Sequence, residues 1–382
     1  MLLLKNAELY TPERLGKKDV LIEGSRIALV SESLEDWARL PEVQVVDLEG
    51  RIAVPGYIDI HEHITGGGGE QGPASRCPEA PLSMLVSNGV TTAIGLLGTD
   101  GVTRSLENLL AKARAFCEEG VTCYMLSGSY GYPPVTLTGS VERDLVLIDL
   151  AVGVKTSLSD HRSPGITGDD LIRLGAEARR GGLLSGKAGI VTIHMGSGKA
   201  GLGPVLYAIA RSDLPARTFL PTHMGRTEEL CKEGLGLLAL GGFLDFTAGL
   251  DEAEDRVAAD RLSYLLDRGW EDQLTLSSDA FGSFPVFSPD GECSGLSFST
   301  PSGIHRLLRL LVRERGESLE RVLKLVTVNP ARLYRLSKGC IAPGYDADIV
   351  VYDEDMGIYA VIAKGKLAAK EGRALIKGRF EP

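Results

Sequence analysis

Between about Tyr57 and Leu336, short apolar runs alternate with longer amphipathic runs, and this alternation leaves few folds open to the chain. The short runs have the length and apolar content of buried strands, and the longer ones carry apolar residues at helical spacing. Eight strand-then-helix units over about 280 residues have the length and rhythm of a (β/α)8 barrel, or TIM barrel. An open, doubly wound sheet is the alternative, because periodicity alone does not show that a sheet closes. We therefore predict an α/β fold with a (β/α)8 TIM barrel over residues 57–336.

The two ends of the chain consist of short apolar runs separated by turns. Residues 1–56 contain LLLKNAELY, DVLIEGSRIALVSE and VQVVDLEGRIAVPG, in which EGSR stands where a hairpin turn would lie. Residues 337–382 contain ADIVVYD, YAVIAKGKLAAKEG and RALIKG. Neither end has enough strands for a stable sheet of its own, so we predict that both ends pair into one small, discontinuous β domain.

Composition and charge exclude several classes of protein. With 382 residues, 43% of them hydrophobic and 24% charged, the chain can bury a large core and is not expected to be disordered. Its net charge of −10 argues against a general nucleic-acid binder, which needs clustered lysines and arginines. The first residues are not expected to form a signal peptide, and no run reaches about 18 apolar residues, so no membrane span is expected. The six cysteines lack CxxC spacing, which is typical of reduced thiols in a cytoplasmic protein.

Polar side chains with metal-binding chemistry stand where the predicted strands end. In a barrel of this kind the active site lies at the carboxyl ends of the strands, so side chains from several strands converge there. Any one of these histidines alone could be a hydrogen-bonded core residue, but several on one rim predict a metal site. Four of the six histidines take part, with one lysine and one aspartate, and the set is His61, His63, Lys155, His194, His223 and Asp279.

The HEHITGGGGE stretch at residues 61–70 contains the first of these candidate ligands. Because side chains alternate along a strand, His61 and His63 are expected to point to the same side and to bind one ion, and imidazole with carboxylate suits Zn2+. Glu62 is expected to point the other way, in a structural or solvent-facing position. The four glycines allow the backbone to approach a ligand closely. A phosphate loop would need Lys and then Ser or Thr after them, whereas here an acid follows, which favours an amine.

Lys155 lies in the predicted fourth strand, within VGVKTSLSD. A lysine buried in a barrel mouth should have its pKa lowered from about 10.4, which produces a neutral amine. A neutral amine can react with CO2 to form a carbamate, whose two oxygens can bridge two metal ions. The alternative is an unmodified lysine that extends to the rim or pairs with Asp160.

The order of these residues resembles that of the amidohydrolase superfamily. The flanking stretches VVDLEGRIAVPGYIDIHEH and VTVNPARLYRLSKGCIAPGYDADIVVYD are similar to the branch that has a split β-sandwich and a binuclear metal barrel. Within that branch, HITGGGGEQGP, VTTAIGLLGTDG, SYGYPPVTLTGS, GVKTSLSDHRS, HMGSGKAGL, PTHMGR and LSSDAFGS resemble the isoaspartyl (β-aspartyl) dipeptidase family. The resemblance implies that residues 1–56 and 337–382 form the β-sandwich domain.

The resemblance also implies two Zn2+ ions per chain, bridged by a carbamylated Lys155 (N6-carboxylysine) and a hydroxide. One ion would be held by His61, His63, Lys155 and Asp279, and the other by Lys155, His194 and His223.

The implied reaction is the hydrolysis of dipeptides linked through the aspartate side chain, which yields aspartate and a free amino acid. Asp279 would take the proton from the bridging water and pass it to the leaving amine. Tyr130 would donate a hydrogen bond to the developing oxyanion. Tyr130 fits this role better than Tyr132, because it lies ten residues before Ser140 of the TGS sequence.

Several further residues are predicted to bind the substrate, which carries an α-amino group and two carboxylates. Glu70 resembles the binder of the α-amino group, and Arg162 and Arg226 have guanidinium forks suited to carboxylates. As alternatives, Arg162 would only pair with Asp160, and Thr99 would only serve as a turn residue. The full set of substrate-binding candidates is Gly68, Glu70, Thr99, Tyr130, Arg162, Arg226 and Ser283.

Other functions remain open at this point. Dihydroorotase-like, hydantoinase-like and N-acyl-amino-acid deacylase-like enzymes would share the metals but offer less reason for Glu70 beside two arginines. In a mononuclear deaminase, Lys155 would have no role. A non-catalytic scaffold of the same fold should have lost metal ligands, whereas every candidate ligand is present here. The expected partner is a small dipeptide substrate, without nucleic acid or membrane. The resemblance implies a homo-oligomer, such as an octamer.

Overall fold

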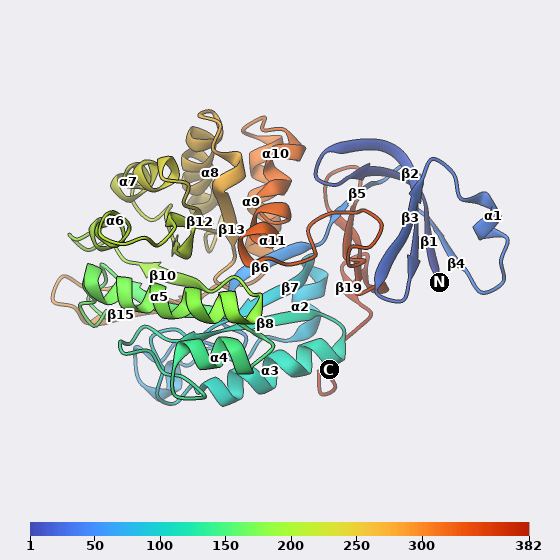
Figure 1. The fold of residues 1–382 in the computed structure, drawn as a ribbon. Coiled ribbons are helices and arrows are strands. Elements are labelled where there is room, and N and C mark those ends of the chain that lie inside the picture. Colours follow the sequence, from blue (N-terminus) through green and yellow to red (C-terminus); the bar gives the residue numbers. More distant parts are fainter. Residues whose placement is uncertain (382) are drawn as a thin grey trace.

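The middle of the chain forms a curled parallel sheet with helices on its outside in the computed structural model, which describes residues 1–381 (Figure 1). One ladder has six strands in the order β11-β10-β9-β8-β7-β6, and β12 and β13 form a separate parallel pair. The eight strands are β6 (Tyr57–Glu62), β7 (Val90–Gly95), β8 (Thr122–Gly128), β9 (Ala151–Leu158), β10 (Ile190–Met195), β11 (Phe219–Thr222), β12 (Leu244–Thr247) and β13 (Leu274–Ser277).

The two ladders are joined at two seams by hydrogen bonds that lie outside the strand pairings. At one seam, the backbone amide of Met224, after β11, donates to the carbonyl of Asp245 in β12 (3.1 Å). At the other, the amide of His63, after β6, donates to the carbonyl of Ala280, after β13 (2.8 Å). The predicted α/β class is therefore confirmed as a curled parallel sheet, whose continuous ladder covers six of the eight predicted strands.

Helices follow the strands in the predicted alternation and form the outer layer (Figure 1). Four of them begin after Ser105, Ser140, Thr167 or Thr227, whose side chains accept a hydrogen bond from the amide three residues later and so cap the helix. The helices are α2 (Leu82–Ser87), α3 (Leu106–Glu119), α4 (Val141–Leu147), α5 (Gly168–Ser185), α6 (Gly203–Ala210), α7 (Glu228–Ala239), α8 (Glu252–Leu266), α9 (Ser302–Arg313), α10 (Leu319–Lys324) and α11 (Val328–Tyr334).

Both faces of the curled sheet are packed. On β10, Val191 and Ile193 belong to the cluster that includes the apolar faces of the surrounding helices. Ile190 belongs to a different cluster, which contains side chains from several other parallel strands and from α11. Within that second cluster, the Tyr334 hydroxyl of α11 is hydrogen-bonded to the Thr192 hydroxyl of β10 (2.9 Å). The inside of the curl is thus filled by side chains at its amino end, which leaves the carboxyl end for polar groups.

The two ends of the chain meet in one nine-stranded sheet beside the helices, where the first and last colours of Figure 1 lie together. Val54 of β5 pairs with Val350 of β16, and the predicted EGSR turn lies between β2 and β3. The division into domains at residues 56 and 337 stays a prediction, and position 382 lies outside the described residues. The strands are β1 (Leu2–Tyr10), β2 (Arg14–Glu23), β3 (Arg26–Ser31), β4 (Gln44–Asp47), β5 (Ile52–Pro55), β16 (Ile349–Tyr352), β17 (Ile358–Ala363), β18 (Lys366–Lys370) and β19 (Arg373–Ala374), with α1 (Glu35–Ala38) before β4.

One element near the site was missed by the sequence prediction. An antiparallel hairpin, β14 (Ser283–Phe287) and β15 (Cys293–Phe298), is inserted between β13 and α9. The Asp290-Gly291 dipeptide between its strands is a common hairpin-turn signal and could have indicated it.

Two further observations concern the predicted cellular setting. Within residues 1–381, no helix combines the length and the apolar composition that crossing a bilayer requires. All six cysteines are free thiols.

Candidate active site

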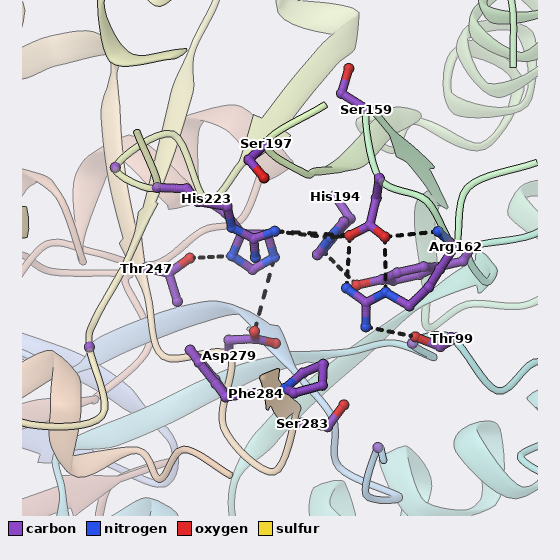
Figure 2. Close-up of a pocket in the computed structure, with 18 of the residues that line it drawn as sticks. Thr99, Ser159, Arg162, His194, Ser197, His223, Thr247, Asp279, Ser283 and Phe284 are labelled. Atoms are coloured by element: carbon purple, nitrogen blue, oxygen red, sulfur yellow. Dashed lines mark hydrogen bonds and ion pairs between the residues drawn. The ribbon is translucent and has the colours of Figure 1, made fainter. Parts of the chain in front are cut away.

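A cavity of about 700 Å³ opens at the carboxyl ends of the parallel strands (Figure 2). It is formed by the segments at the ends of all eight parallel strands, β6 to β13, and by the β14–β15 hairpin. Most of the predicted site residues line it, namely His63, Gly68, Thr99, Tyr130, Arg162, His194, His223, Arg226, Asp279 and Ser283. His61, Glu70 and Lys155 lie behind this lining and contact it through hydrogen bonds or close charges.

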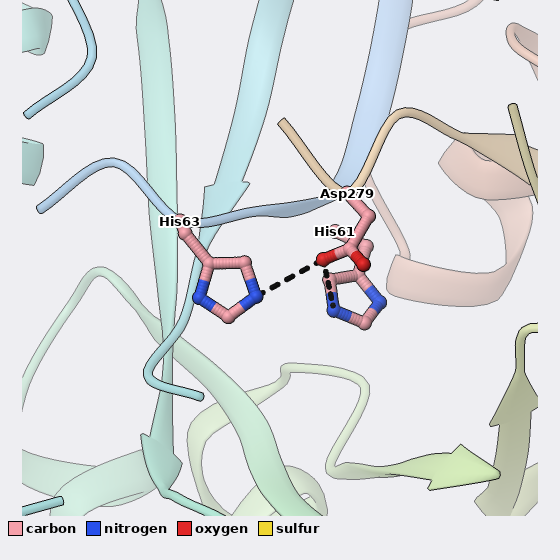
Figure 3. Close-up of side chains that lie close together, drawn as sticks. All are labelled: His61, His63 and Asp279. Atoms are coloured by element: carbon pink, nitrogen blue, oxygen red, sulfur yellow. Dashed lines mark ion pairs between the residues drawn. The ribbon is translucent and has the colours of Figure 1, made fainter. Parts of the chain in front are cut away.

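Three predicted metal ligands come together at the base of the cavity (Figure 3). One ligand atom from each of His61, His63 and Asp279 lies within 4.8 Å of the others. Asp279 Oδ1 lies 3.0 Å from Nε2 of His63 and 3.3 Å from Nε2 of His61. This group joins the end of the first parallel strand to the turn after the last one, as the barrel prediction requires.

Two of the candidate ligands have unusual backbone conformations. His223 has φ 64° and Asp279 has φ 51°, both in the left-handed region that residues other than glycine seldom adopt. Such a residue costs about 1 to 3 kcal/mol and persists where the surrounding structure holds it. Here the sharp turn directly after β11 and after β13 aims each side chain into the cavity.

Lys155 is fully buried in β9, and its Nζ lies 2.9 Å from Nε2 of His61. Burial lowers the pKa of the Lys155 amine to about 7, although the Asp279 carboxylate acts in the opposite direction. Lys155 forms no salt bridge with any described residue, and Asp160 is paired with other side chains. The structure therefore does not contain the Lys155–Asp160 pair that was the alternative role for this lysine.

The donor atoms fit a metal ion. Nε2 of His223 and Oδ1 of Asp279 are buried and have no hydrogen-bond partner among the described residues. The rings of His61 and His223 are oriented through Nδ1, by Thr222 (3.1 Å) and Thr247 (2.7 Å), so that Nε2 of each faces the cavity. Burial lowers the pKa of both histidines well below the ordinary value, which keeps the imidazoles neutral, as metal binding requires.

His194 is in the same cavity but is held by protein groups. Its Nδ1 is hydrogen-bonded to the Tyr130 hydroxyl (2.6 Å), and its Nε2 lies 3.0 Å from Oδ2 of Asp160. The His194 and His223 rings are adjacent, with centroids 4.6 Å apart. The structure therefore places His194 beside His223, yet both nitrogens of His194 are occupied by other side chains.

Glu70 links three of the other predicted substrate-binding residues. Its Oε1 accepts hydrogen bonds from Ser283 (2.8 Å), Thr99 (3.2 Å) and Arg162 (3.2 Å). Its Oε2 is buried and has no hydrogen-bond partner among the described residues. A buried carboxylate oxygen without a donor is unfavourable, so Oε2 is a strong acceptor for a ligand.

Asp160 is a site residue whose importance the sequence prediction missed. It accepts two hydrogen bonds from the guanidinium of Arg162, at 2.8 and 2.9 Å, and one from the Arg162 backbone amide (2.9 Å), and it lies 4.0 Å from Nη1 of Arg226. Burial alone would raise the pKa of Asp160, but the hydrogen bonds from Arg162 and His194 hold it well below the usual range. Arg162 therefore pairs with Asp160, as in the alternative role given to it above, and it also contacts Glu70.

The glycine loop requires glycine at two positions because another backbone segment passes close by. Gly66 and Gly68 have φ of 76° and 80°. A Cβ would lie 2.3 Å from the Cys77 carbonyl oxygen at Gly66 and 2.6 Å from the Ser75 carbonyl oxygen at Gly68. The buried Arg104, which the sequence prediction also missed, donates to the Cys77 carbonyl (2.8 Å) and to two carbonyls of the loop. The loop is therefore a fixed support for the residues around it.

The position of Glu62 differs from one of the two that were expected. It is fully buried, so its predicted solvent-facing position is wrong and the structural alternative holds. Neither carboxylate oxygen has a hydrogen-bond partner among the described residues, and burial raises the pKa of Glu62 well above the ordinary value.

Comparison with known proteins shows the family of this chain. Residues 52–368 match the amidohydrolase family, and the chain belongs to it. Among solved structures, the chain is similar to the β-aspartyl dipeptidase of Fervidobacterium islandicum AW-1 in complex with the β-Asp-Leu dipeptide. That structure is 42% identical, has a TM-score of 0.92 and is aligned over 98% of both chains.

Curated relatives are more distant. A dihydroorotase of Lactobacillus leichmannii is 23% identical over 93% of this chain and 89% of its own length. Adenine deaminase 2 of Agrobacterium fabrum is 28% identical over 95% of this chain and 55% of its own length. The chain is thus an amidohydrolase whose structural neighbours include β-aspartyl dipeptidases.

Proposed function

We propose that this protein is a metal-dependent dipeptidase that hydrolyses β-aspartyl (isoaspartyl) dipeptides to aspartate and a free amino acid. The observation that carries the proposal is the buried Oε2 of Glu70, which has no hydrogen-bond partner among the described residues, beside the guanidinium of Arg162, with Arg226 lining the same cavity. A β-aspartyl dipeptide carries one α-ammonium and two carboxylates, so its charges complement these three side chains. The similarity to a dipeptidase crystallised with β-Asp-Leu supports the same substrate class.

The metal centre is part of this proposal. His61, His63 and Asp279 would hold one ion, and Lys155 as a carbamate would bridge it to a second. The other two ligands of the second ion would be His194 and His223. When bound, the ions would supply a water acidic enough to attack near neutral pH and a Lewis acid for the scissile carbonyl. Zn2+ is the proposed metal, because neutral imidazoles and a carboxylate suit it.

The chain itself supplies the proton transfer. Asp279, whose Oδ1 is free of hydrogen bonds within the described residues, would accept a proton from the attacking water as the new C–O bond forms. It would then deliver this proton to the leaving nitrogen as the C–N bond breaks. The starting carboxylate is restored in the same turnover.

Tyr130 would donate a hydrogen bond to the carbonyl oxygen as negative charge develops there. In this structure its hydroxyl is engaged with Nδ1 of His194 (2.6 Å). The proposed roles of Tyr130 and His194 therefore both require this hydrogen bond to open, since Nδ1 cannot accept from Tyr130 and bind a metal at once.

The remaining candidates would orient the substrate. Glu70 would bind the α-ammonium, and Thr99 and Ser283, which already contact Glu70, would support the aspartyl end together with Gly68. Arg162 and Arg226 would bind carboxylate. Water-excluding walls would come from the hairpin, whose Phe284, Pro285 and Phe287 line the cavity.

The proposal extends to the architecture. The eight strands would form a closed (β/α)8 TIM barrel over residues 57–336, which the hydrogen bonds at both seams support. Residues 1–56 and 337–382 would form the β-sandwich domain, supported by the shared nine-stranded sheet. The homo-oligomer stays a prediction.

The decisive experiment compares β-Asp-Leu with α-Asp-Leu as substrates of the purified enzyme, with the metal content measured on the same sample. We expect hydrolysis of the β-linked dipeptide and a far lower kcat/KM for the α-linked one. Comparable rates on both would remove the isoaspartyl assignment. Hydrolysis of dihydroorotate without cleavage of β-Asp-Leu would favour the dihydroorotase alternative.

A further inference from the structure

A second cavity, of about 320 Å³, lies at the opposite end of the parallel strands from the candidate active site. It is lined by Ile190, the first residue of β10, and by Thr218, Phe243 and Gln273, which directly precede β11, β12 and β13. The rest of the lining comes from α5, from α11 and from the loops near them. The cavity is therefore at the amino ends of the strands, away from the predicted metal ligands.

Four arginines converge on this cavity, and no described residue in its lining carries a carboxylate. They come from separate segments and are Arg179 of α5, Arg217 before β11, and Arg332 and Arg335 in and after α11. We refer to these four residues and the cavity as the arginine pocket. The concentration of positive charge stands out because the chain as a whole has a net charge of −10.

No carboxylate among residues 1–381 forms a salt bridge with an arginine of the arginine pocket. Arg179, Arg217 and Arg335 form no salt bridge or side-chain hydrogen bond with the residues that the structure describes. Arg332 donates to the backbone carbonyl of Asp272 and lies over the Phe243 ring, 5.4 Å from its centroid. Like charges around one concave site repel each other, so the arrangement is most favourable when an anion lies between them.

The floor of the arginine pocket is preformed. The side-chain amide of Gln273 donates to the carbonyls of Leu238 (2.8 Å) and Gly242 (2.7 Å), which fixes its position and leaves its oxygen free as an acceptor. Phe243 is only 7% exposed and packs into the cluster that fills the inside of the curl. A ligand would therefore meet a fixed floor and four cationic side chains.

We propose that the arginine pocket binds a small phosphate-bearing anion with at least two negative charges. Guanidinium forks bind phosphate oxygens in pairs, and four of them match a multivalent anion. The volume suits a small molecule and excludes a folded partner. This site is independent of the proposed dipeptidase activity, because none of its residues lines the candidate active site.

The ligand would connect α5, the segment before β11, and α11. Because an anion that binds only the folded state stabilises it by mass action, occupancy should raise the thermal midpoint of unfolding. This gives a second readout besides binding itself.

The test uses the metal-loaded enzyme and two probes, inorganic phosphate and fructose 1,6-bisphosphate, with binding measured by isothermal titration calorimetry. The variant is the double substitution Arg217→Gln and Arg335→Gln, because both side chains are exposed and their loss should not impair folding. The matched control is Arg114→Gln, an exposed arginine of α3 outside the pocket.

We expect saturable binding of the bisphosphate to the wild type and to the Arg114→Gln control, with a raised thermal midpoint. The double variant should bind it at least about tenfold more weakly, because the loss of one charge-assisted hydrogen bond lowers an affinity by about this factor. Hydrolysis of dipeptide should be unchanged. Absence of saturable binding to the wild type would overturn the proposal. So would equal binding by the double variant, which would assign the anion to another site such as the metal cavity.

Discussion

Replacing Glu70 by glutamine tests the assignment of the substrate ammonium most directly. The substitution keeps the size of the side chain and one oxygen, so the donors Ser283, Thr99 and Arg162 can still be satisfied at the Oε1 position. It replaces the buried, unpartnered Oε2 by an NH2 group. An NH2 group donates hydrogen bonds and would face the α-ammonium of the substrate, which also only donates.

The size of the effect follows from burial. Breaking one side of a buried, hydrogen-bonded charge pair costs about 2 to 5 kcal/mol, and each 1.4 kcal/mol is about tenfold. We expect Glu70→Gln to lower kcat/KM for β-Asp-Leu by about 30-fold to 3,000-fold. The upper part of this range is favoured, because Glu70 is largely shielded from water, with 6% of its side chain exposed.

The assay compares two substrates that differ only in the ammonium group. N-succinyl-leucine has the carbon skeleton and both carboxylates of β-Asp-Leu but lacks the α-amino group. The wild type should strongly prefer β-Asp-Leu, and Glu70→Gln should lose most of that preference. Glu79→Gln, which removes an exposed carboxylate outside the cavity, is the control and should behave as the wild type.

The reasoning would be refuted if Glu70→Gln reduced the kcat/KM of both substrates by the same factor. That result would mean that Glu70 only supports the loop or the arginine beside it. A variant with unchanged kcat/KM for β-Asp-Leu would equally remove the assigned contact.

Three further predictions follow from the site and from the terminal sheet. Tyr130→Phe should lower kcat by about 10² to 10³ with little change in KM, whereas Tyr132→Phe should be near wild type, and equal losses in steady-state kinetics would contradict the assignment. Lys155→Ala should lose bound metal relative to the wild type, and an unchanged metal content by elemental analysis would exclude the bridging role. Lys338, with 3% of its side chain exposed, pairs with Asp346 and Asp348, so Lys338→Met should reduce the free energy of unfolding by about 3 to 5 kcal/mol in urea titrations. A loss below about 1 kcal/mol would show that the two aspartates find other partners.

Much of the fold was predictable because it is encoded locally. The alternation of strand-like and helical runs needs only the spacing of apolar residues, and the helix starts at Ser105 and Thr167 need only a capping side chain and the residues after it. The hairpin β14–β15 was missed although Asp290-Gly291 indicates a turn, because the expected rhythm placed a helix directly after β13.

The candidate metal ligands could also be found from the sequence. Histidine and aspartate at strand ends are informative because parallel strands place their carboxyl ends on one rim, whatever the exact packing. This rule brings His61 and Asp279 together across more than half of the chain. It does not specify which ring nitrogen is free, and the engagement of His194 by Tyr130 and Asp160 is visible only in three dimensions.

The sequence by itself thus determined the order of strands and helices and the chemistry available at the strand ends, since both depend on local spacing. Only the tertiary structure decided which of these groups are satisfied. The unpartnered oxygen of Glu70, the central position of Asp160 and the uncompensated arginine pocket each arise from contacts between segments far apart in the chain. Whether a buried or clustered charge has a partner depends on distances of a few Å between such segments, and no local pattern encodes those distances.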